Sequence, residues 1–449
     1  MIDAIFSSAP LIYLTQSVWR DEAYSILIAQ TPISTYFQLS FEPPLYYTLL
    51  HFWIQIFGTS EVAVRSLSVF AFFIAIFFVA KLALKLFGKS WVSWYLPVFF
   101  ALNPMLLYYA FEARSYGLYI AFTVMSTYFY LEKKWLWYTI TSTLGLYTHA
   151  YMVFVLLTQA IHYLSTQVRY RYIHINKFLR DPMVLSCFAI LLLYSPWLTK
   201  MYLDIPRLKQ SWYFPVDMQL FKSVLGNIFL GYEGTPWNLW KFTARISVVI
   251  FFITMGSMLR KHNRSLSWYF LILLYLPLFV ILAASVYKPL YVMRYMIPST
   301  IAQIMLIGIA LHAISNRLLQ KFVGASMLCF VIGFSIWNTQ HHKKIDMRNI
   351  LAQINALQRE RDVILVDDAL ILYETMYYNS SNSPVYWYNP RGDAFPWYIG
   401  DHIITESQIV KDVPPYPQRG FLIHLDGTYS IVYNAPISRK QPGYKNQQL

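Results

Sequence analysis

The chain has 449 residues, of which 57% are hydrophobic, 18% aromatic and only 13% charged. Soluble domains carry roughly 25% charged residues, so this composition excludes an ordinary soluble protein and favours a membrane protein. The formal net charge is +14, but the basic residues recur in short segments between apolar runs instead of forming one patch. That is the positive-inside pattern of membrane proteins, and it argues against a nucleic acid as partner.

Apolar stretches long enough, or nearly so, to cross a membrane as helices of about 20 residues recur along most of the chain. The expected spans are residues 64–83, 91–109, 117–131, 135–147, 150–164, 183–201, 242–258, 266–286, 296–314 and 322–337. Residues 2–19 contain Ser, Thr, Gln and Pro and would make a poor span. We therefore expect a multi-pass α-helical membrane domain over residues 1–337, with about ten or eleven spans.

The segments between the spans differ in charge. One set is basic and is predicted to be cytoplasmic; it contains Lys81, Lys85, Lys89, Lys133, Lys134, Arg169, Arg171, Lys177, Arg180, Arg260, Lys261, Arg264, Arg317 and Lys321. The opposite set holds every polar cluster suited to chemistry, including an acidic loop at residues 19–63. The pattern predicts a protein of the plasma (inner) membrane whose site faces the non-cytoplasmic side.

The composition becomes more polar after residue 337. Residues 343–361 predict an amphipathic helix, and residues 362–367 predict a buried strand followed by a helix to about residue 378. Residues 384–388, 421–425 and 429–433 predict further strands. We expect a small extracytoplasmic α/β domain over residues 338–449, with a disordered tail from Ser438.

Three carboxylates stand close together near the start of a chain that has only 22 acidic residues. Asp21 and Glu22 lie in Trp-Arg-Asp-Glu-Ala-Tyr-Ser at residues 19–25, and Glu42 lies in Phe-Glu-Pro-Pro-Leu-Tyr-Tyr at residues 41–47. Asp21 and Glu22 also suit the first turn of a helix, where negative charge is favourable. The Pro-Pro pair after Glu42 predicts the start of the next helix.

Together with Phe-Gly-Thr-Ser-Glu at residues 57–61 and Arg-Ser-Leu-Ser at residues 65–68, these segments resemble the first external loop of the polyprenyl-phosphate-sugar-dependent glycosyltransferases. Protein O-mannosyltransferases and lipid A aminoarabinose transferases typify that family. The resemblance implies a GT-C fold, a lipid-phosphate-linked sugar donor and an acidic pair at the active site. The sequence departs from the family before Asp21, where a full transmembrane helix is normal. Either the chain begins inside that helix, or the first span is short and polar.

Glycosyl transfer to a hydroxyl needs a carboxylate that takes up a proton as the oxygen attacks the anomeric carbon. A phosphate leaves already ionised, so no acid is required for the leaving group. Asp21 is our first candidate for this base and Glu22 the second. Glu42 is expected to bind the acceptor or to hold a metal with His149, unless Glu42 is an exposed cap and His149 a hydrogen-bonded core residue. The sequence itself requires no cofactor and leaves a divalent metal open.

Two further segments resemble donor-binding parts of the family. Glu112, Arg114 and Tyr116 form Glu-Ala-Arg-Ser-Tyr, in which Arg114 either grips a phosphate through its planar fork or pairs with Glu112. Arg294 and Tyr295 match the family's Arg-Tyr ahead of a late span. A cation there suits the lipid phosphate, with help from Lys288, and a snorkelling anchor is the alternative.

The segment at residues 202–241 is predicted to be a long loop that closes over a lipid-linked sugar with interleaved aromatic and charged residues. These are Arg207, Lys209, Trp212, Tyr213, Tyr232, Glu233 and Trp237.

The sequence thus predicts a membrane glycosyltransferase that moves a sugar, a hexose or a pentose, from a polyprenyl-phosphate donor to a protein, lipid or glycan acceptor. One alternative is a transporter or flippase of lipid-linked sugars. Another is a non-catalytic subunit whose C-terminal domain recruits partners.

Overall fold

The computed structural model of the chain describes residues 11–40, 42–168, 179–204, 216–231, 239–257, 264–341, 344–401 and 403–434. It divides into two compact units. The first comprises Met1–Thr15 and Pro32–Lys343, and the second comprises Gln16–Thr31 and Lys344–Leu449. The acidic pair Asp21 and Glu22 therefore belongs to the second unit, together with the C-terminal part of the chain.

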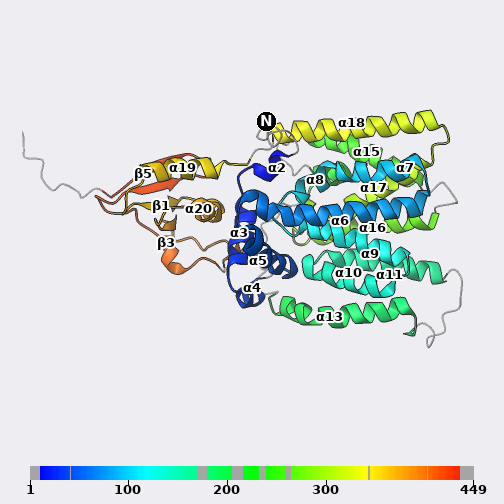
Figure 1. Cartoon of the computed structure of the whole chain (residues 1–449), viewed down its shortest axis with the longest axis horizontal. Coiled ribbons are helices and arrows are strands. Elements are labelled where there is room, and N and C mark those ends of the chain that lie inside the picture. The colour runs from blue at the N-terminus through cyan, green and yellow to red at the C-terminus, as the bar shows by residue number, and fades with distance from the viewer. Residues whose placement is uncertain are drawn as a thin grey trace, which may run out of the picture. The chain divides into compact units, whose positions relative to one another are not determined.

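The first unit is helical, and its longer helices lie nearly parallel as a bundle (Figure 1). Its elements are α2 (Ile12–Thr15), α4 (Ile33–Leu39), α5 (Leu45–Phe57), α6 (Glu61–Phe87), α7 (Trp91–Ala101), α8 (Pro104–Ala110), α9 (Tyr116–Leu131), α10 (Trp135–Thr148), α11 (Met152–Val168), α13 (Pro182–Asp204), α14 (Met218–Leu230), α15 (Trp240–Gly256), α16 (Arg264–Ser285), η4 (Met293–Met296), α17 (Ile297–His312) and α18 (Arg317–His341).

Each stretch that was predicted to span the membrane is largely helical, and the stretch at residues 91–109 is divided between two helices. Within the described residues, five segments are both long and apolar enough to cross a membrane: Glu61–Phe87, Pro182–Asp204, Arg264–Ser285, Met293–His312 and Arg317–Gln340. Large apolar side chains cover their outer surfaces; Phe73, Leu192 and Phe279 are 64%, 75% and 73% exposed. Such surfaces are stable against lipid and would aggregate in water. The unit is therefore a multi-pass membrane bundle.

The prediction of one continuous span at residues 91–109 was wrong. Helix α7 ends at Ala101 and α8 begins at Pro104. The break arises because the side chain of Asn103 accepts a hydrogen bond from the Leu106 backbone N–H, 3.2 Å away, and because Pro104 opens the new helix. An Asn N-cap followed by Pro at the first position is a strong helix start.

The prediction of an uninterrupted loop at residues 202–241 was also wrong. Helix α14 occupies Met218–Leu230 and is capped by Asp217, whose side chain accepts from the Leu220 backbone N–H. Gly226 brings α14 against α15, because a Cβ there would lie 2.1 Å from the Thr243 carbonyl oxygen. This helix is only 13 residues long, so its apolar face does not stand out as a membrane span.

The second unit is an α/β domain. It contains α3 (Arg20–Gln30), α19 (Met347–Leu357), β1 (Val363–Val366), η5 (Ala369–Ile371), α20 (Leu372–Tyr378), β2 (Val385–Tyr388), α21 (Trp397–Gly400), η6 (Glu406–Gln408), β3 (Ile409–Val410), β4 (Gly420–Ile423) and β5 (Tyr429–Val432). The sheet order is β3-β2-β1-β4-β5. Strands β1 to β4 are parallel, and β5 is antiparallel to β4. The amphipathic helix and most of the strands were correctly predicted, whereas the two-residue β3 was missed. The tail from Ser438 lies outside the described residues.

Helix α3 packs against this domain through a close contact at Gly400. The backbone φ of Gly400 is +103°, and a Cβ there would lie 2.1 Å from the ring of Tyr24. The hydroxyl of Tyr373 donates to the Gly400 carbonyl oxygen, and the rings of Tyr24 and Tyr373 are 5.8 Å apart. Only glycine combines this left-handed conformation with such close packing. The contact fixes the start of α3, and with it Asp21 and Glu22, within the second unit.

Candidate functional site

The polar centre of the first unit is an ion pair between Arg114 and Glu42. Arg114 Nη2 lies 2.7 Å from Glu42 Oε1. The hydroxyl of Tyr47 donates to the other carboxylate oxygen of Glu42, and Arg114 Nη1 donates to the same hydroxyl over 3.2 Å. The three side chains therefore form a closed ring of hydrogen bonds. Tyr47 was not predicted to be part of a site, although its place in the first turn after Pro43 and Pro44 is consistent with this role.

Glu42 is positioned by the loop that precedes it. Its backbone N–H donates to Ser40 Oγ over 3.1 Å, and Lys200 of α13 donates to the Ser40 carbonyl oxygen over 2.7 Å. The next helix, α5, begins directly after the Pro-Pro pair, as predicted. The exposed-cap alternative for Glu42 does not account for these contacts, because its carboxylate is engaged by two side chains.

Arg114 lies in the short turn between α8 and α9 and is buried. Ser68 of α6 donates from its Oγ to the Arg114 carbonyl oxygen over 2.9 Å. One turn further on, a Cβ on Gly117 would lie 2.4 Å from the Ser68 carbonyl oxygen. Small residues allow membrane helices to approach this closely. The contact between α6 and α9 thus sets the position of the Arg114 backbone.

His149 follows α10 and is enclosed by aromatic rings. Its imidazole stacks on Tyr119 at 4.3 Å and meets Tyr295 edge-on at 4.8 Å. Tyr116 is buried and lies 6.1 Å from the same ring. The Tyr151 backbone N–H is 3.2 Å from His149 Nδ1, so this nitrogen acts as an acceptor and the neutral ring carries its proton on Nε2.

Arg294, in η4, lies near the aromatic rings around His149. It is buried, and its guanidinium carbon is 5.9 Å from the centre of the Tyr295 ring. Burial, together with the charges of Arg114 and Arg294, lowers the pKa of His149 to about 3. The imidazole is therefore neutral at physiological pH, and the potential at its position is positive. A buried position near two guanidinium groups is suited to an anionic group.

Seven predicted substrate-binding residues thus lie in the first unit; they are Glu42, Glu112, Arg114, Tyr116, His149, Arg294 and Tyr295. Glu112 is 2% exposed, in the same turn as Arg114. The ion pair that the structure shows for Arg114 is made with Glu42. Within the described residues, no group of three or more His, Cys, Asp or Glu side chains is placed to hold a metal ion. The aromatic and charged residues predicted at residues 205–215 and 232–238 lie outside the described ranges.

Asp21 and Glu22, in the second unit, occupy the first turn of α3. Glu22 is fully buried; it accepts from the Trp19 backbone N–H and pairs with Lys344, both at 3.3 Å. Asp21 Oδ1 lies 2.9 Å from Arg20 Nε, and 12% of its side chain is exposed. Helix capping therefore describes the contacts of Glu22, whereas Asp21 pairs with Arg20 and keeps a small part of its side chain exposed.

Glu374 of α20 was not predicted to belong to a site. This carboxylate is buried and accepts from the Arg20 backbone N–H over 2.6 Å. Burial raises the pKa of Glu374 to about 7; the nearby Glu22 also raises it, whereas the Arg20 hydrogen bond and Lys344 oppose the shift. The only sequence signal was one acidic residue within an otherwise apolar and aromatic helix. Its contacts support the start of α3 next to Asp21.

Two solved structures of ArnT from Cupriavidus metallidurans have a similar architecture. The apo structure matches with a TM-score of 0.61 and 13% sequence identity, over 92% of this chain and 90% of that chain. The structure bound to undecaprenyl phosphate matches with a TM-score of 0.59 and 14% identity, again over 92% and 90%. No family model and no curated protein matches the chain. The chain is therefore a multi-pass membrane protein with the fold of ArnT.

Proposed function

We propose that the protein is a membrane glycosyltransferase that takes a sugar from a polyprenyl-phosphate donor. The observation that carries this proposal is the buried cluster of Arg114, His149 and Arg294, which creates a positive potential. It occurs in a chain with the fold of ArnT, and one of the ArnT structures contains undecaprenyl phosphate. The family resemblance of the sequence points to the same donor as the buried basic cluster in this fold.

In this proposal Arg114 and Arg294 neutralise the lipid phosphate as it leaves the anomeric carbon. Fixed cations stabilise the leaving group without reorganisation during the reaction. His149 is neutral and carries its proton on Nε2, so it is suited to donate a hydrogen bond to the donor substrate. Glu42 and Tyr47 hold the Arg114 guanidinium in one orientation.

Asp21 is assigned as the base that receives the proton of the acceptor hydroxyl. This assignment is based on the family resemblance and on the partial exposure of Asp21 beside the fully buried Glu22. Glu22 is assigned a positioning role, because its contacts are those of a helix cap. The site is assigned to the non-cytoplasmic side from the distribution of basic segments. The acceptor, whether protein, lipid or glycan, and the sugar itself are left open.

The test uses membranes that carry equal amounts of wild-type protein, Asp21→Asn or Asp412→Asn, supplied with a radiolabelled polyprenyl-phosphate sugar. Asp412 is an exposed aspartate of the second unit and serves as the matched control. We expect label in a glycosylated product with wild type and Asp412→Asn, and a loss of about 100-fold or more with Asp21→Asn. Undiminished transfer by Asp21→Asn would remove Asp21 from the mechanism.

A further inference from the structure

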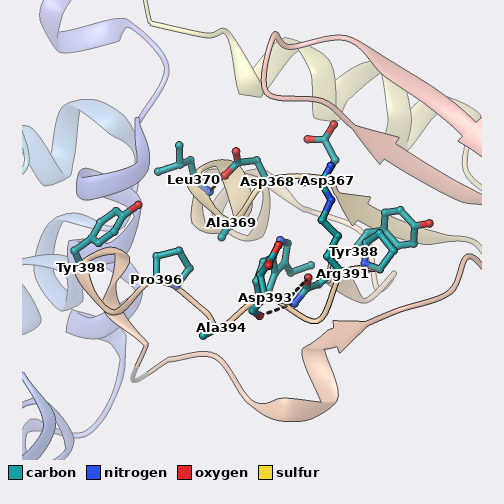
Figure 2. A pocket seen from close by; sticks show the side chains of 13 residues that line it. Asp367, Asp368, Ala369, Leu370, Tyr388, Arg391, Asp393, Ala394, Pro396 and Tyr398 are labelled. Carbon is teal, nitrogen blue, oxygen red and sulfur yellow. Dashed lines mark hydrogen bonds between the residues drawn. The ribbon is translucent and has the colours of Figure 1, made fainter. Parts of the chain in front are cut away.

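The α/β unit contains a cavity that the proposed reaction does not use. Its volume is about 510 Å³, and residues of η5, β2, α21 and the adjoining loops line it. Figure 2 shows the side chains of Asp367, Tyr388, Asp393 and Tyr398 around it. Small-molecule sites in proteins have volumes of about 300–1,000 Å³, so the cavity is large enough for one.

The position of the cavity follows from the sheet topology. Strands β1 and β2 are parallel neighbours, and they end at Val366 and Tyr388. The lining residues Asp367, Asp368 and Asn389 follow these ends directly. Ligands of open α/β sheets bind outside the carboxyl ends of parallel strands, where the loops diverge. The cavity lies at this carboxyl-end edge of the sheet, beside β1 and β2.

One wall of the cavity is held rigidly by Asn389, which is buried. Its side-chain amide donates to the Asp393 carbonyl oxygen over 2.8 Å and accepts from the Asp393 backbone N–H over 3.0 Å. The loop at residues 389–393 is thus closed by backbone contacts. The carboxylate of Asp393 takes no part in these two bonds and is on the exposed surface of the loop, where it lines the cavity.

The opposite side of the cavity is held by Asp367 and Asp368. Asp367 Oδ2 lies 2.6 Å from His424 Nδ1, and His424 Nε2 lies 3.1 Å from Ser430 Oγ. Asp368 accepts from the Leu370 backbone N–H over 2.8 Å and caps η5. These contacts fix both carboxylates in place before any ligand arrives, which reduces the entropy that is lost on binding.

The lining combines three aspartates with one arginine, Arg391, and with the aromatic residues Trp387, Tyr388 and Tyr398. An excess of carboxylates repels a phosphate. Ionised carboxylates accept hydrogen bonds from hydroxyl groups, and aromatic rings pack against apolar surface. A saccharide offers both, because hydroxyl groups surround apolar C–H faces. No metal cluster is formed by the acidic residues in the described ranges.

We propose that this cavity is a second, lectin-like site, which binds a saccharide that carries no phosphate. It is independent of the lipid-phosphate site in the helical unit and of the transfer reaction. The test of this site is therefore the binding of a free sugar. If no sugar binds there, the proposed transfer reaction is not affected.

The test measures the binding of sugar probes to full-length protein in nanodiscs. Saturation-transfer NMR detects binding, and a titration gives the affinity. The neutral probes are methyl α-mannoside and N-acetylglucosamine, and the anionic probe is glucose 1-phosphate. We expect at least one neutral probe to bind and glucose 1-phosphate to bind at least tenfold more weakly. We also expect Asp393→Asn and Tyr398→Ala each to weaken the binding of the neutral probe about tenfold, which corresponds to about 1.4 kcal/mol and is typical of one such contact.

Asp393 and Tyr398 are exposed, so their replacement leaves the core of the sheet intact; near-ultraviolet circular dichroism checks this. Asp412→Asn is the matched control for the aspartate. Arg114→Gln distinguishes the cavity from the lipid-phosphate site, because this variant should leave the binding of the neutral probe unchanged. Three results would overturn the proposal: no neutral probe binds, binding is equal in both cavity variants and wild type, or glucose 1-phosphate binds as tightly.

Discussion

Arg114 Nη2 lies 2.7 Å from Glu42 Oε1, and the two partners differ in exposure: 7% of the arginine side chain is exposed, against 40% of the glutamate. The guanidinium is therefore buried, whereas its partner carboxylate is partly exposed to the surroundings. Leaving a buried charge without its partner is costly. Glu42 keeps the guanidinium paired and oriented when no anionic substrate is bound, and the proposed lipid phosphate would share the same donors.

Replacing Arg114 by Gln should abolish most of the sugar transfer. The variant removes the fixed positive charge but keeps a hydrogen-bonding side chain of similar length. Loss of one such electrostatic donor typically slows a reaction by about 100-fold to 1,000-fold. The measurement is the initial rate of transfer from a labelled polyprenyl-phosphate sugar at equal membrane levels of protein. Arg317→Gln is the control, since Arg317 is an exposed arginine at the start of α18. Equal rates for Arg114→Gln and the control would show that Arg114 has no role in the reaction.

Replacing Gly117 by Ala should separate α6 and α9 and displace the Arg114 turn. The added Cβ would approach the Ser68 carbonyl oxygen to 2.4 Å, and such overpacking costs about 1–3 kcal/mol. We expect lower thermal stability, measured as the protein that remains monodisperse after heating, together with slower transfer. Gly333→Ala in α18 is the control, because no atom lies within 4 Å of its added Cβ. If both variants behave like wild type, the close contact does not position the site.

The pKa of Glu374 makes the start of α3 sensitive to pH. The folded-state pKa is about 7 and the ordinary value is 4.5. Between these two values the folded state binds more protons than the unfolded state, so stability is greatest below pH 4.5 and falls as the pH rises through 7. The full effect corresponds to about 3 kcal/mol. Hydrogen exchange of α3 and α20, corrected for intrinsic rates, should show weaker protection at pH 8 than at pH 5.5.

Glu374→Gln is the matched variant for this prediction. It retains an acceptor for the Arg20 backbone N–H but cannot ionise. Its protection should vary with pH by less than one third of the wild-type change. A pH response equal to that of wild type would assign the effect to another group.

The helices were predictable because each apolar stretch has the length and spacing of a membrane helix, and hydrophobic burial needs no long-range information. Helix α14 and the break at Asn103 were missed because they depend on caps and on close contacts such as Gly226 against Thr243. The partnership of α3 with α20 was missed for a different reason. It joins Arg20 to Glu374 across most of the chain, and local sequence patterns carry no signal for such a contact.

The candidate site was predictable in part. Short motifs such as Glu-Ala-Arg-Ser-Tyr identified Arg114 and Tyr116 as residues of interest and left Glu112 or a phosphate as the partner of the arginine. The structure shows an ion pair with Glu42 and a shared hydroxyl from Tyr47. Partner choice depends on how α5 packs in the bundle, which the spacing of the residues along the chain does not specify.

Cleavage of the donor by this chain alone is the central prediction, and purified protein in proteoliposomes tests it most directly. The liposomes contain a polyprenyl-phosphate sugar labelled in both the lipid and the sugar, with a mixture of envelope lipids and peptides as acceptors. We predict that free polyprenyl phosphate and a glycosylated product appear in equal amounts. Donor that crosses the bilayer with its lipid and sugar still joined would contradict the account and would identify a flippase.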